Sequence, residues 1–326
     1  MKRKSKRELI LETIGNFKNK RVLVIGDSIL DEFVYGEKIG TSLETPTPKL
    51  KHEKTDILFG GAANVVESIL ELGGKVSFVT VLGDDSYAKN YDGFVHKNLN
   101  FFPIKENGRK TTVKRRFWAG NEKLLQIDHL DNRDISDNSK REIIGILLRE
   151  IKNSDIVLFV DQRHGMMTSD LIAKLKLLVV ENGKGAIASS QISQRASNHL
   201  DYCGSYLVCM NHKEAQAVDS EFSKKCGLGN LAKKLDSNIC VTLGKEGALM
   251  YLNGKEHFAE GIEVEQKEDA CGAGDCFLAA LSLINFEKFP QEALYLSNCW
   301  AGLSVTTPGT RSPKITDLVE YVKKNG

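Results

Sequence analysis

The sequence lacks a Cys-x-x-Cys pair, an apolar run of about 20 residues that could span a membrane, and a surplus of charge of either sign. Its seven cysteines are odd in number, which disfavours a disulfide framework and favours a reducing cytoplasm. Because 45 basic and 43 acidic side chains nearly cancel to a formal charge of +2, no overall field favours nucleic acid or an anionic membrane. We therefore expect a cytoplasmic protein with neither of these partners.

The sequence also lacks internal repeats, low-complexity tracts and long linkers, so we expect residues 1–326 to form a single domain. A content of 41% hydrophobic and 27% charged residues is typical of a globular protein. The basic start contains apolar residues spaced by three and four, which predicts a surface helix rather than a signal peptide. These residues are Leu9, Ile10, Ile14 and Phe17.

Short β-branched runs alternate with helical patterns along most of the chain. Continuous apolar strands separated by helices predict an α/β fold, doubly wound, with a mainly parallel central sheet flanked by helices. In such sheets ligands bind beyond the carboxyl ends of the strands, and we expect the functional residues there. The predicted strands are 21–27, 75–83, 155–161, 185–190, 205–211 and 238–244.

Two stretches, 37–61 and 100–130, interrupt this alternation with extended segments and turns. They predict a small β-rich lid contributed by about 37–58 and 100–128, since closing a site excludes water from a reactive intermediate. An ordinary meander at the edge of the main sheet is the alternative.

The motif "ACGAGDCF" (270–277) places two glycines and Asp275 just ahead of an apolar helical run. One interpretation is an aspartate that caps the helix. The other is phosphoryl transfer, in which backbone N–H groups at the helix start stabilise the moving phosphoryl group and the carboxylate takes a proton from the attacking hydroxyl. Cys271 and Cys276 flank this motif and are expected to be ordinary packing residues rather than metal ligands.

The segment "TTVKRRFWAG" (111–120) is strongly basic. On a strand, Lys114 and Arg116 share one face, where they could contact a phosphate on a substrate, and Arg115 points to the other face. The alternative is a solvated cationic edge strand that resists aggregation. An unphosphorylated sugar or nucleoside would not need this pair of cations.

Five short motifs occur in a specific order, each placed near the end of a predicted strand or the start of a predicted helix. They are "GDSILD" (26–31), "GGAAN" (60–64), "NHKE" (211–214), "TLGKEG" (242–247) and "DACGAGD" (269–275). The chain resembles the ribokinase-like (PfkB) carbohydrate kinases, which have these motifs in this order, over nearly all of its length. The resemblance implies an ATP- and Mg²⁺-dependent transfer of the γ-phosphoryl group to a sugar hydroxyl.

Within that family the sequence looks most like the heptose 7-phosphate kinase branch, on residues 44–51, 59–74, 111–128 and 308–313. This narrower resemblance implies transfer to O1 of a heptose 7-phosphate for lipopolysaccharide or capsule precursors. In many bacteria that kinase is fused to a nucleotidyltransferase, and here we expect a stand-alone kinase acting with a separate nucleotidyltransferase. Lids in this family commonly pair, which implies a homodimer.

The resemblance also implies roles for individual residues. Asp275 would be the general base, with Gly272, Ala273 and Gly274 as the anion hole. Substrate would be held by Asp27, Asp31, Gly60, Gly61, Asn64, Lys114, Arg116, Asp161 and His164. The nucleotide would contact Asn211, Glu214, Thr242, Gly244 and Gly247, with Gly309 at the adenine and Glu214 holding Mg²⁺ through water.

Several positions depart from the family pattern. Ala270 stands where the family usually has threonine, and Gln126 where the branch commonly has arginine. Segment 161–165 carries Arg163 and His164, and segment 188–198 lacks the usual Asp-Pro. His164 could shuttle protons or bind phosphate, or simply complete a hydrogen-bonded turn. These changes leave open the exact sugar. The alternatives are a non-catalytic module that binds a sugar nucleotide or a partner enzyme, and a kinase for an unphosphorylated sugar or nucleoside.

Overall fold

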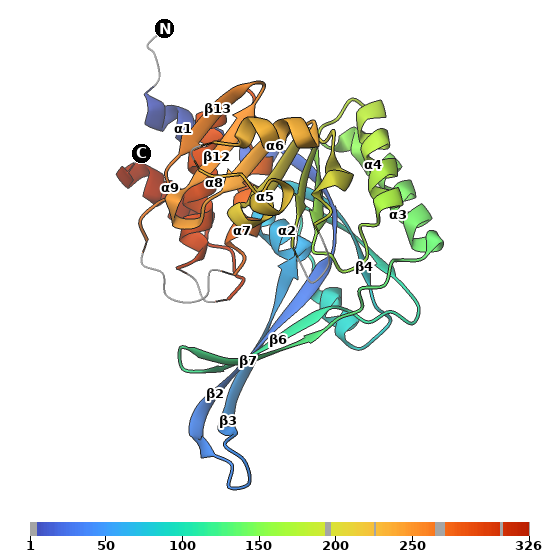
Figure 1. Cartoon of the computed structure of the whole chain (residues 1–326), viewed down its shortest axis with the longest axis vertical. Coiled ribbons are helices and arrows are strands. Elements are labelled where there is room, and N and C mark those ends of the chain that lie inside the picture. Colours follow the sequence, from blue (N-terminus) through green and yellow to red (C-terminus); the bar gives the residue numbers. More distant parts are fainter. Residues whose placement is uncertain (1–4, 193–196, 225, 265–270, 307–308, 326) are drawn as a thin grey trace.

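The structure is a computed structural model that describes residues 5–192, 197–224, 226–264, 271–306 and 309–325. A nine-stranded sheet forms the body (Figure 1), in the order β13-β12-β11-β10-β9-β8-β1-β4-β5. All six predicted strands lie in it and pair in parallel, whereas β12 and β13 add an antiparallel edge. In chain order its strands are β1 Arg21–Gly26, β4 Lys75–Leu82, β5 Leu99–Lys105, β8 Ile156–Asp161, β9 Ala186–Ser190, β10 Leu207–Asn211, β11 Asn238–Thr242, β12 Ala248–Leu252 and β13 Lys255–Ala259.

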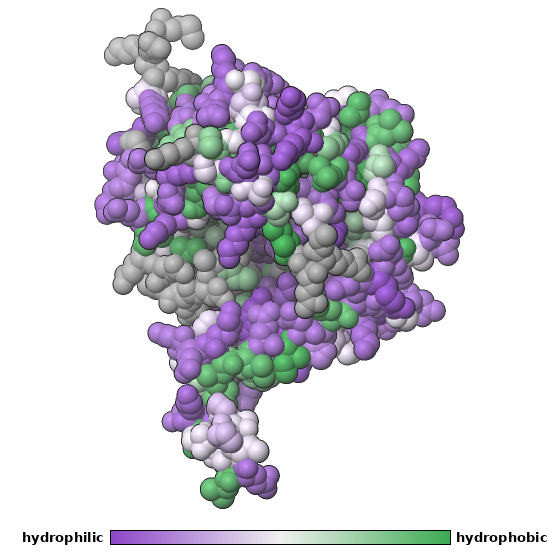
Figure 2. All heavy atoms as spheres, viewed as in Figure 1, coloured by the Kyte–Doolittle hydropathy of each residue, from purple (hydrophilic) through white to green (hydrophobic). Residues whose placement is uncertain are grey.

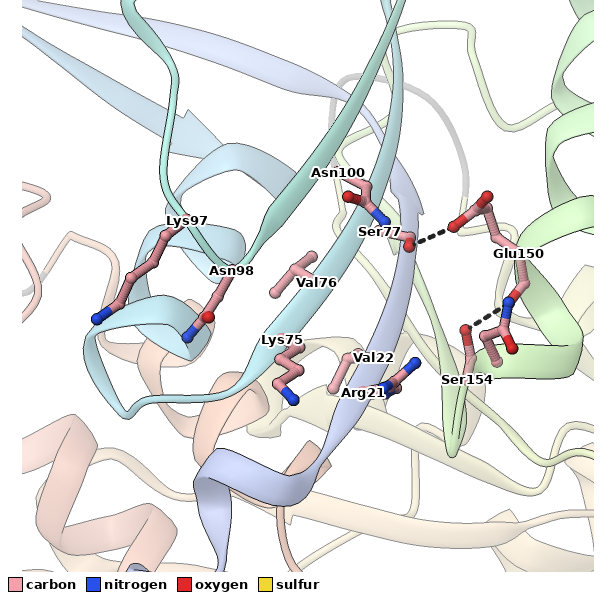
Figure 3. A pocket seen from close by; sticks show the side chains of 11 residues that line it. Arg21, Val22, Lys75, Val76, Ser77, Lys97, Asn98, Asn100, Glu150 and Ser154 are labelled. Carbon is pink, nitrogen blue, oxygen red and sulfur yellow. Dashed lines mark hydrogen bonds between the residues drawn. The ribbon is translucent and has the colours of Figure 1, made fainter.

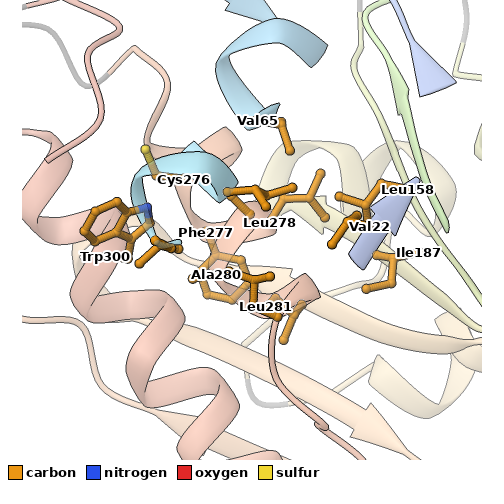
Figure 4. Packing of buried hydrophobic residues seen from close by; sticks show 14 of the residues in the cluster. Val22, Val65, Leu158, Ile187, Cys276, Phe277, Leu278, Ala280, Leu281 and Trp300 are labelled. Atoms are coloured by element: carbon orange, nitrogen blue, oxygen red, sulfur yellow. The ribbon is translucent and has the colours of Figure 1, made fainter. Parts of the chain in front are cut away.

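Helices cover both faces of this sheet, as a doubly wound fold requires, and two separate groups of buried apolar residues lie on its two sides. In Figure 4, Val22 and Leu158 from the strands face Phe277 and Leu278 of a helix on one side. No helix in the described ranges is long and apolar enough to cross a membrane. The α-helices are α1 Lys6–Gly15, α2 Ala62–Glu71, α3 Asp137–Glu150, α4 Ser169–Glu181, α5 His212–Val218, α6 Leu228–Leu235, α7 Ala273–Ser282, α8 Pro290–Ser304 and α9 Ile315–Asn325.

A second sheet of four strands, in the order β3-β2-β6-β7, projects from the body as a long arm (Figure 1). It is built from β2 Ser28–Thr41, β3 Pro48–Gly61, β6 Val113–Ala119 and β7 Glu122–His129. The predicted lid bounds need correction at two places. Residues 100–105 belong to β5 of the main sheet, because their apolar side chains pack beside β4, and the small sheet starts at Ser28 rather than near residue 37.

Candidate active site

The turn before α7 leaves backbone donors exposed at a helix start. The first intrahelical bond runs from the N–H of Cys276 to the carbonyl of Gly272 at 2.9 Å, so the N–H groups of Ala273, Gly274 and Asp275 have no partner within the helix. Gly272 is the N-cap residue with φ +88°, a conformation that favours glycine. The N-cap is Gly272 and, among the described residues, no side chain caps this helix, so the capping interpretation of Asp275 is wrong.

Asp275 instead meets a second helix start. Asn64 lies in the first turn of α2, and its Nδ2 donates to Oδ2 of Asp275 at 2.9 Å. Gly61 is the N-cap of α2 with φ +59°, and a Cβ there would lie 2.6 Å from the carbonyl oxygen of Asp27. The positive ends of two helices therefore converge on one carboxylate, which makes the space in front of them suited to an anion.

The surroundings of Asp275 also change its acidity. Burial raises the pKa of Asp275 to about 7, and the charge of Asp31 adds to the rise, while the Asn64 hydrogen bond and Lys114 oppose it. A carboxylate with a pKa near neutrality can both accept a proton from a hydroxyl and release it again.

The arm contributes a buried ion pair beside this carboxylate. Arg116 donates from Nη1 to Oδ1 of Asp31 at 2.5 Å, and both side chains are buried. A Cβ at Gly60 would clash with the Asp31 carboxylate, so this position on β3 requires glycine. Lys114 is paired with Asp31 across β2 and β6 and lies on the same face of β6 as Arg116. The predicted shared face of Lys114 and Arg116 is therefore directed at Asp31 and Asp275.

Arg115 lies on the opposite face, as its position predicts. Its Nε donates to Glu32 at 2.8 Å, and its Nη2 to the hydroxyl of Tyr87 in the short helix η2 (Tyr87–Gly93) at 2.9 Å. The alternative of a simple cationic edge strand is excluded for β6, because β6 lies between β2 and β7.

Asp27 is held by the loop that follows β8. It is buried, and its carboxylate accepts the backbone N–H groups of Gln162 at 2.9 Å, His164 at 3.5 Å and Met166 at 3.2 Å. Burial, followed by repulsion from Asp161, raises the pKa of Asp27 to about 7 against these three bonds. These contacts show that Asp27 fixes the loop 162–166, and its predicted contact with a sugar hydroxyl stays a prediction.

Asp161 is likewise occupied by protein groups. Its Oδ2 accepts from Asn198 at 2.8 Å, the Tyr202 hydroxyl at 3.0 Å and Ser190 at 3.3 Å, and its Oδ1 accepts the backbone N–H of Arg163 at 2.8 Å. Arg163 has φ +65°, which is unusual for a residue with a side chain. Asp161 therefore fixes this strained turn at the end of β8 and ties it to β9.

His164 takes part in a hydrogen-bonded turn, and its predicted contact with substrate stays a prediction. Its Nδ1 lies 2.8 Å from Oδ1 of Asn132, and its carbonyl accepts from Nη2 of Arg109 at 2.5 Å. Its backbone N–H also donates to Asp27, and the residue is buried.

The predicted nucleotide residues gather at the ends of β10 and β11. Asn211 and Thr242 are paired directly across these two strands. Asn211 caps α5 by accepting the N–H of Glu214 at 3.0 Å, and Oε2 of Glu214 accepts the N–H of Asn211 at 2.7 Å. This arrangement is a capping box, and it uses one carboxylate oxygen of Glu214. Burial raises the pKa of Glu214.

The three predicted glycines of the nucleotide side differ in their surroundings. Gly244 has φ +61° and open space where a Cβ would be, as a residue facing a ligand would have. Gly247 instead packs against the carbonyl of Ala259. Gly309 lies at the base of the arm, where a Cβ would come within 2.8 Å of Leu58 and 3.5 Å of Phe33. Gly309 therefore lies beside residues of the arm, and its predicted contact with the adenine stays a prediction.

A fully ligated metal site is absent from the described ranges, which contain no group of three or more His, Cys, Asp or Glu side chains placed to hold an ion. Besides its capping box, Glu214 accepts the backbone N–H of Ile192, so it fits an ion that it would contact through water, as Mg²⁺ with its water shell would be. Cys276 is buried, and burial raises the pKa of its thiol to about 11, so it is the packing residue that was expected.

One surface hollow lies away from all these residues. It has a volume of about 230 Å³ and is lined by Arg21, Lys75, Lys97 and Glu150 among others (Figure 3). Arg21 and Lys75 begin β1 and β4, so the hollow is at the amino ends of parallel strands, opposite to the edge where ligands of such sheets bind.

Three polar residues around Asp161 were not predicted as part of the site. Ser190 ends β9, and its place at a strand end was the available signal. Asn198 and Tyr202 lie at the start and the end of the short helix η4 (His199–Tyr202), and no sequence signal indicated them. Ala270 and residues 193–196 lie outside the described residues, so their predicted effects have no structural counterpart here.

Comparison with known proteins identifies the family. The family model described as pfkB family carbohydrate kinase matches residues 19–317. The chain belongs to the pfkB family of carbohydrate kinases. It is therefore a phosphotransferase with an alcohol group as acceptor, and a sugar kinase.

Curated relatives match nearly the whole chain. The "Bifunctional protein HldE" of Desulfatibacillum aliphaticivorans is 31% identical over 94% of this chain and 63% of its own length. The protein of the same name from Sulfurimonas denitrificans is 29% identical over 92% of this chain and 64% of its own length. The chain thus spans just under two thirds of these relatives.

Solved structures confirm the fold. Phosphofructokinase-2 from Escherichia coli, in complex with substrates and products, has a TM-score of 0.76 at 16% identity and covers 94% of this chain and 99% of its own. The ribokinase of Arabidopsis thaliana, complexed with ribose and ATP, has a TM-score of 0.71 at 19% identity and covers 93% and 99%. At this identity, the likeness supports the α/β ribokinase-like architecture alone.

Proposed function

We propose that this pfkB kinase transfers the γ-phosphoryl group of ATP to a hydroxyl of a sugar phosphate, and that its acceptor is O1 of a heptose 7-phosphate. The observation that carries the proposal is the Asp275 carboxylate, which does not cap its helix and stands among N–H groups at the start of α7 that have no partner within that helix.

In this proposal Asp275 acts as the general base. As the acceptor oxygen bonds to the γ-phosphorus and the bond to the ADP oxygen breaks, the hydroxyl proton passes to the Asp275 carboxylate. The N–H groups of Ala273, Gly274 and Asp275 donate to the phosphoryl oxygens as charge develops on them. Both functions require a turn of small residues, and Gly274 has no atom within 4 Å of the place where a Cβ would be.

The acceptor would bind between the starts of α2 and α7 and the base of the arm. Asn64, Asp31 and the backbone at Gly60 and Gly61 supply groups for its hydroxyls. Lys114 faces Asp275 and would meet the anionic end of the acceptor. Arg116 adds its positive charge from within the pair with Asp31. Asp27, Asp161 and His164 would act indirectly, by holding the loop 162–166 in place.

ATP would bind over the ends of β10 and β11, with its phosphates directed at the start of α7. Thr242 and Gly244 would contact the phosphates and ribose, and Asn211 and Glu214 would orient Mg²⁺ through water. When bound, Mg²⁺ would neutralise part of the negative charge of the ATP phosphates. Gly309 would support the base of the arm, because it packs against Leu58 of β3 and Phe33 of β2.

The choice of heptose 7-phosphate rests on the resemblance of residues 44–51, 59–74 and 111–128 to that branch. It is supported by curated relatives named HldE that match more than nine tenths of the chain. The product would serve lipopolysaccharide or capsule precursor synthesis, and a separate nucleotidyltransferase would consume it.

A homodimer through the arm also forms part of the proposal. Cross-strand pairing places Ile57, Leu125 and Ile127 on the face of the small sheet that carries Glu32 and Arg115, away from Asp31. Ile57, Leu125 and Ile127 are 44%, 53% and 41% exposed. Figure 2 shows apolar surface along the projecting arm. A second copy would cover such a face.

The test is incubation of the protein with ATP, Mg²⁺ and a panel of acceptors, namely heptose 7-phosphate, hexose phosphates and free sugars. ADP release and the mass of the product are followed for each. A product formed only from heptose 7-phosphate supports the full proposal, and one formed only from free sugars overturns the assignment of a sugar phosphate. Binding of ATP with no product from any acceptor overturns the proposal.

A further inference from the structure

Asn64 and Asp275 belong to different helices, 211 positions apart, and their hydrogen bond joins the first turn of α2 to the first turn of α7. Asn64 is 1% exposed, so its amide has little freedom to turn elsewhere. Its Nδ2 lies only 2.7 Å from the point where a Cβ of Gly272 would be. The N-cap of α7 must therefore be glycine for the amide to reach the carboxylate.

The orientation of the amide follows from charge. A carboxylate accepts and does not donate, so Asn64 must present Nδ2 and not Oδ1 to it. Among the described residues, Oδ1 of Asn64 has no hydrogen-bond partner although it is buried. This leaves Oδ1 for a group that arrives with the acceptor, while Nδ2 is committed to Asp275.

Other charged or titratable groups also face Asp275. Asp31 lies on β2, Lys114 lies on β6, and Cys276 follows Asp275 on α7. Arg116 forms an ion pair with Asp31. In the described part of the chain, none of these groups donates a hydrogen bond to the Asp275 carboxylate, whereas Asn64 does. The charges act at a distance, but the amide fixes the direction of the carboxylate.

We propose that Asn64 is the positioning residue of the general base: its amide orients the Asp275 carboxylate and holds it ready to accept the acceptor proton. This inference rests on the proposed function and deepens it, because it adds to the acceptor contact proposed for Asn64 a second role that acts through Asp275. A hydrogen bond to the charged form of an acid stabilises that form, so the bond also keeps more of the base ionised near neutral pH.

The test measures the titration of Asp275 directly, without relying on turnover. The protein is labelled with ¹³C at the aspartate carboxyls, and the Asp275 signal is identified by its loss in Asp275→Asn. In the wild-type protein the midpoint is expected at about 7. In Asn64→Leu, which has a similar shape but no donor, the midpoint is expected to rise by about one pH unit. In Asn64→Asp, like-charge repulsion should raise it further.

Ser68→Ala is the matched control. Ser68 lies one turn further along α2, is fully buried and accepts a hydrogen bond from Nε1 of Trp300 at 2.6 Å. Its loss weakens α2 packing without removing a bond to Asp275, so the midpoint should stay at the wild-type value. Circular dichroism of each variant identifies any that fails to fold, and Asn64→Asp replaces Asn64→Leu in that case.

Turnover is the second readout. In Asn64→Leu the pH at half-maximal kcat should rise with the NMR midpoint, kcat near pH 7 should fall about tenfold, and the KM for ATP should not change. An unchanged NMR midpoint in both Asn64 variants overturns the positioning role, whatever the kinetics show. A raised midpoint in a protein that phosphorylates no acceptor supports the positioning role and overturns the proposed function.

Discussion

The guanidinium of Arg116 donates to the carboxylate of Asp31 at 2.5 Å, and the pair is buried where the arm meets the body. Removing one partner of a buried pair leaves the other charge without compensation. Arg116→Ala should therefore lower the free energy of unfolding by about 3 kcal/mol, measured by urea denaturation. Arg115→Ala, on the same strand and more exposed, should cost less than about 1 kcal/mol. Equal losses of unfolding free energy in the two variants would contradict the claim that burial makes the Arg116–Asp31 pair costly to break.

Asp275→Asn should abolish most turnover and leave ATP binding intact. The asparagine has nearly the same shape but cannot take the proton, and general base catalysis contributes about 10² to 10⁴ in rate. The measurements are kcat from ADP release and the Kd for ATP by calorimetry. A variant with more than about a tenth of wild-type kcat would show that another group serves as the base.

The rate should depend on pH through Asp275. Its pKa is raised to about 7, and only the ionised carboxylate accepts a proton, so kcat/KM should fall as pH drops below about 7. The midpoint of this fall is measured between pH 5 and 9 with saturating ATP. A profile that is flat down to pH 5 would be incompatible with a base of this pKa.

The same shift predicts a stability difference. An acid whose pKa is raised on folding binds its proton more tightly in the folded state, so its contribution to stability falls as pH rises from about 4 to about 7. Asp275→Asn removes this cost and should stabilise the fold at pH 8 by about 2 kcal/mol, allowing for partial exposure of the side chain. The gain should shrink at pH 5. Urea denaturation at the two pH values measures it, and a loss of stability at pH 8 would contradict the cause given for the pKa.

Two glycines of the α7 turn should respond differently to alanine. In Gly272→Ala the new Cβ would lie 2.7 Å from Nδ2 of Asn64, and the residue would keep a φ of +88° that alanine rarely adopts. This substitution should destabilise the protein by about 2 kcal/mol. Gly274→Ala has open space around it and should fold as well as wild type, but the methyl group would stand where the phosphoryl oxygens approach, lowering kcat at least tenfold. Thermal unfolding and kcat separate the two effects. Full activity in Gly274→Ala would place the phosphoryl group elsewhere.

The exposed face of the arm should hold two copies together. A charge at Leu125 opposes burial of that face, so Leu125→Glu should convert a dimer into a monomer in light scattering at micromolar concentration. Gln126→Glu, on the same strand with its side chain on the other face, is the control and should leave the dimer intact. A wild-type monomer at these concentrations would remove the dimer from the proposal.

Much of the fold could be predicted from the sequence because its strands are buried on both faces. Residues 22–25 and 157–160 are apolar without interruption, and such runs between helices specify a parallel sheet. The split of residues 100–130 could not be predicted. β5 and β6 are both strands of seven residues with similar local sequence patterns. Residues 99–105 join the main sheet because they pair with β4, which lies outside that local pattern.

The candidate site was predicted in part. The turn before Asp275 and the shared face of Lys114 and Arg116 follow from local spacing, and the structure agrees with both. Asp27 and Asp161 have the sequence features of ligand-binding residues, and in the structure their carboxylates accept hydrogen bonds from backbone and side-chain donors in distant parts of the chain. Sequence spacing reveals which groups reach a strand end, but not which of them are already occupied there.

The most direct test compares wild type with Asp275→Asn in ATP, Mg²⁺ and heptose 7-phosphate, following ADP release and product mass. The account predicts that the wild-type protein adds one phosphoryl group to the sugar phosphate, and that the variant binds both substrates and forms almost none of this product. Equal product from both proteins, or ATP binding without product from either, would contradict it.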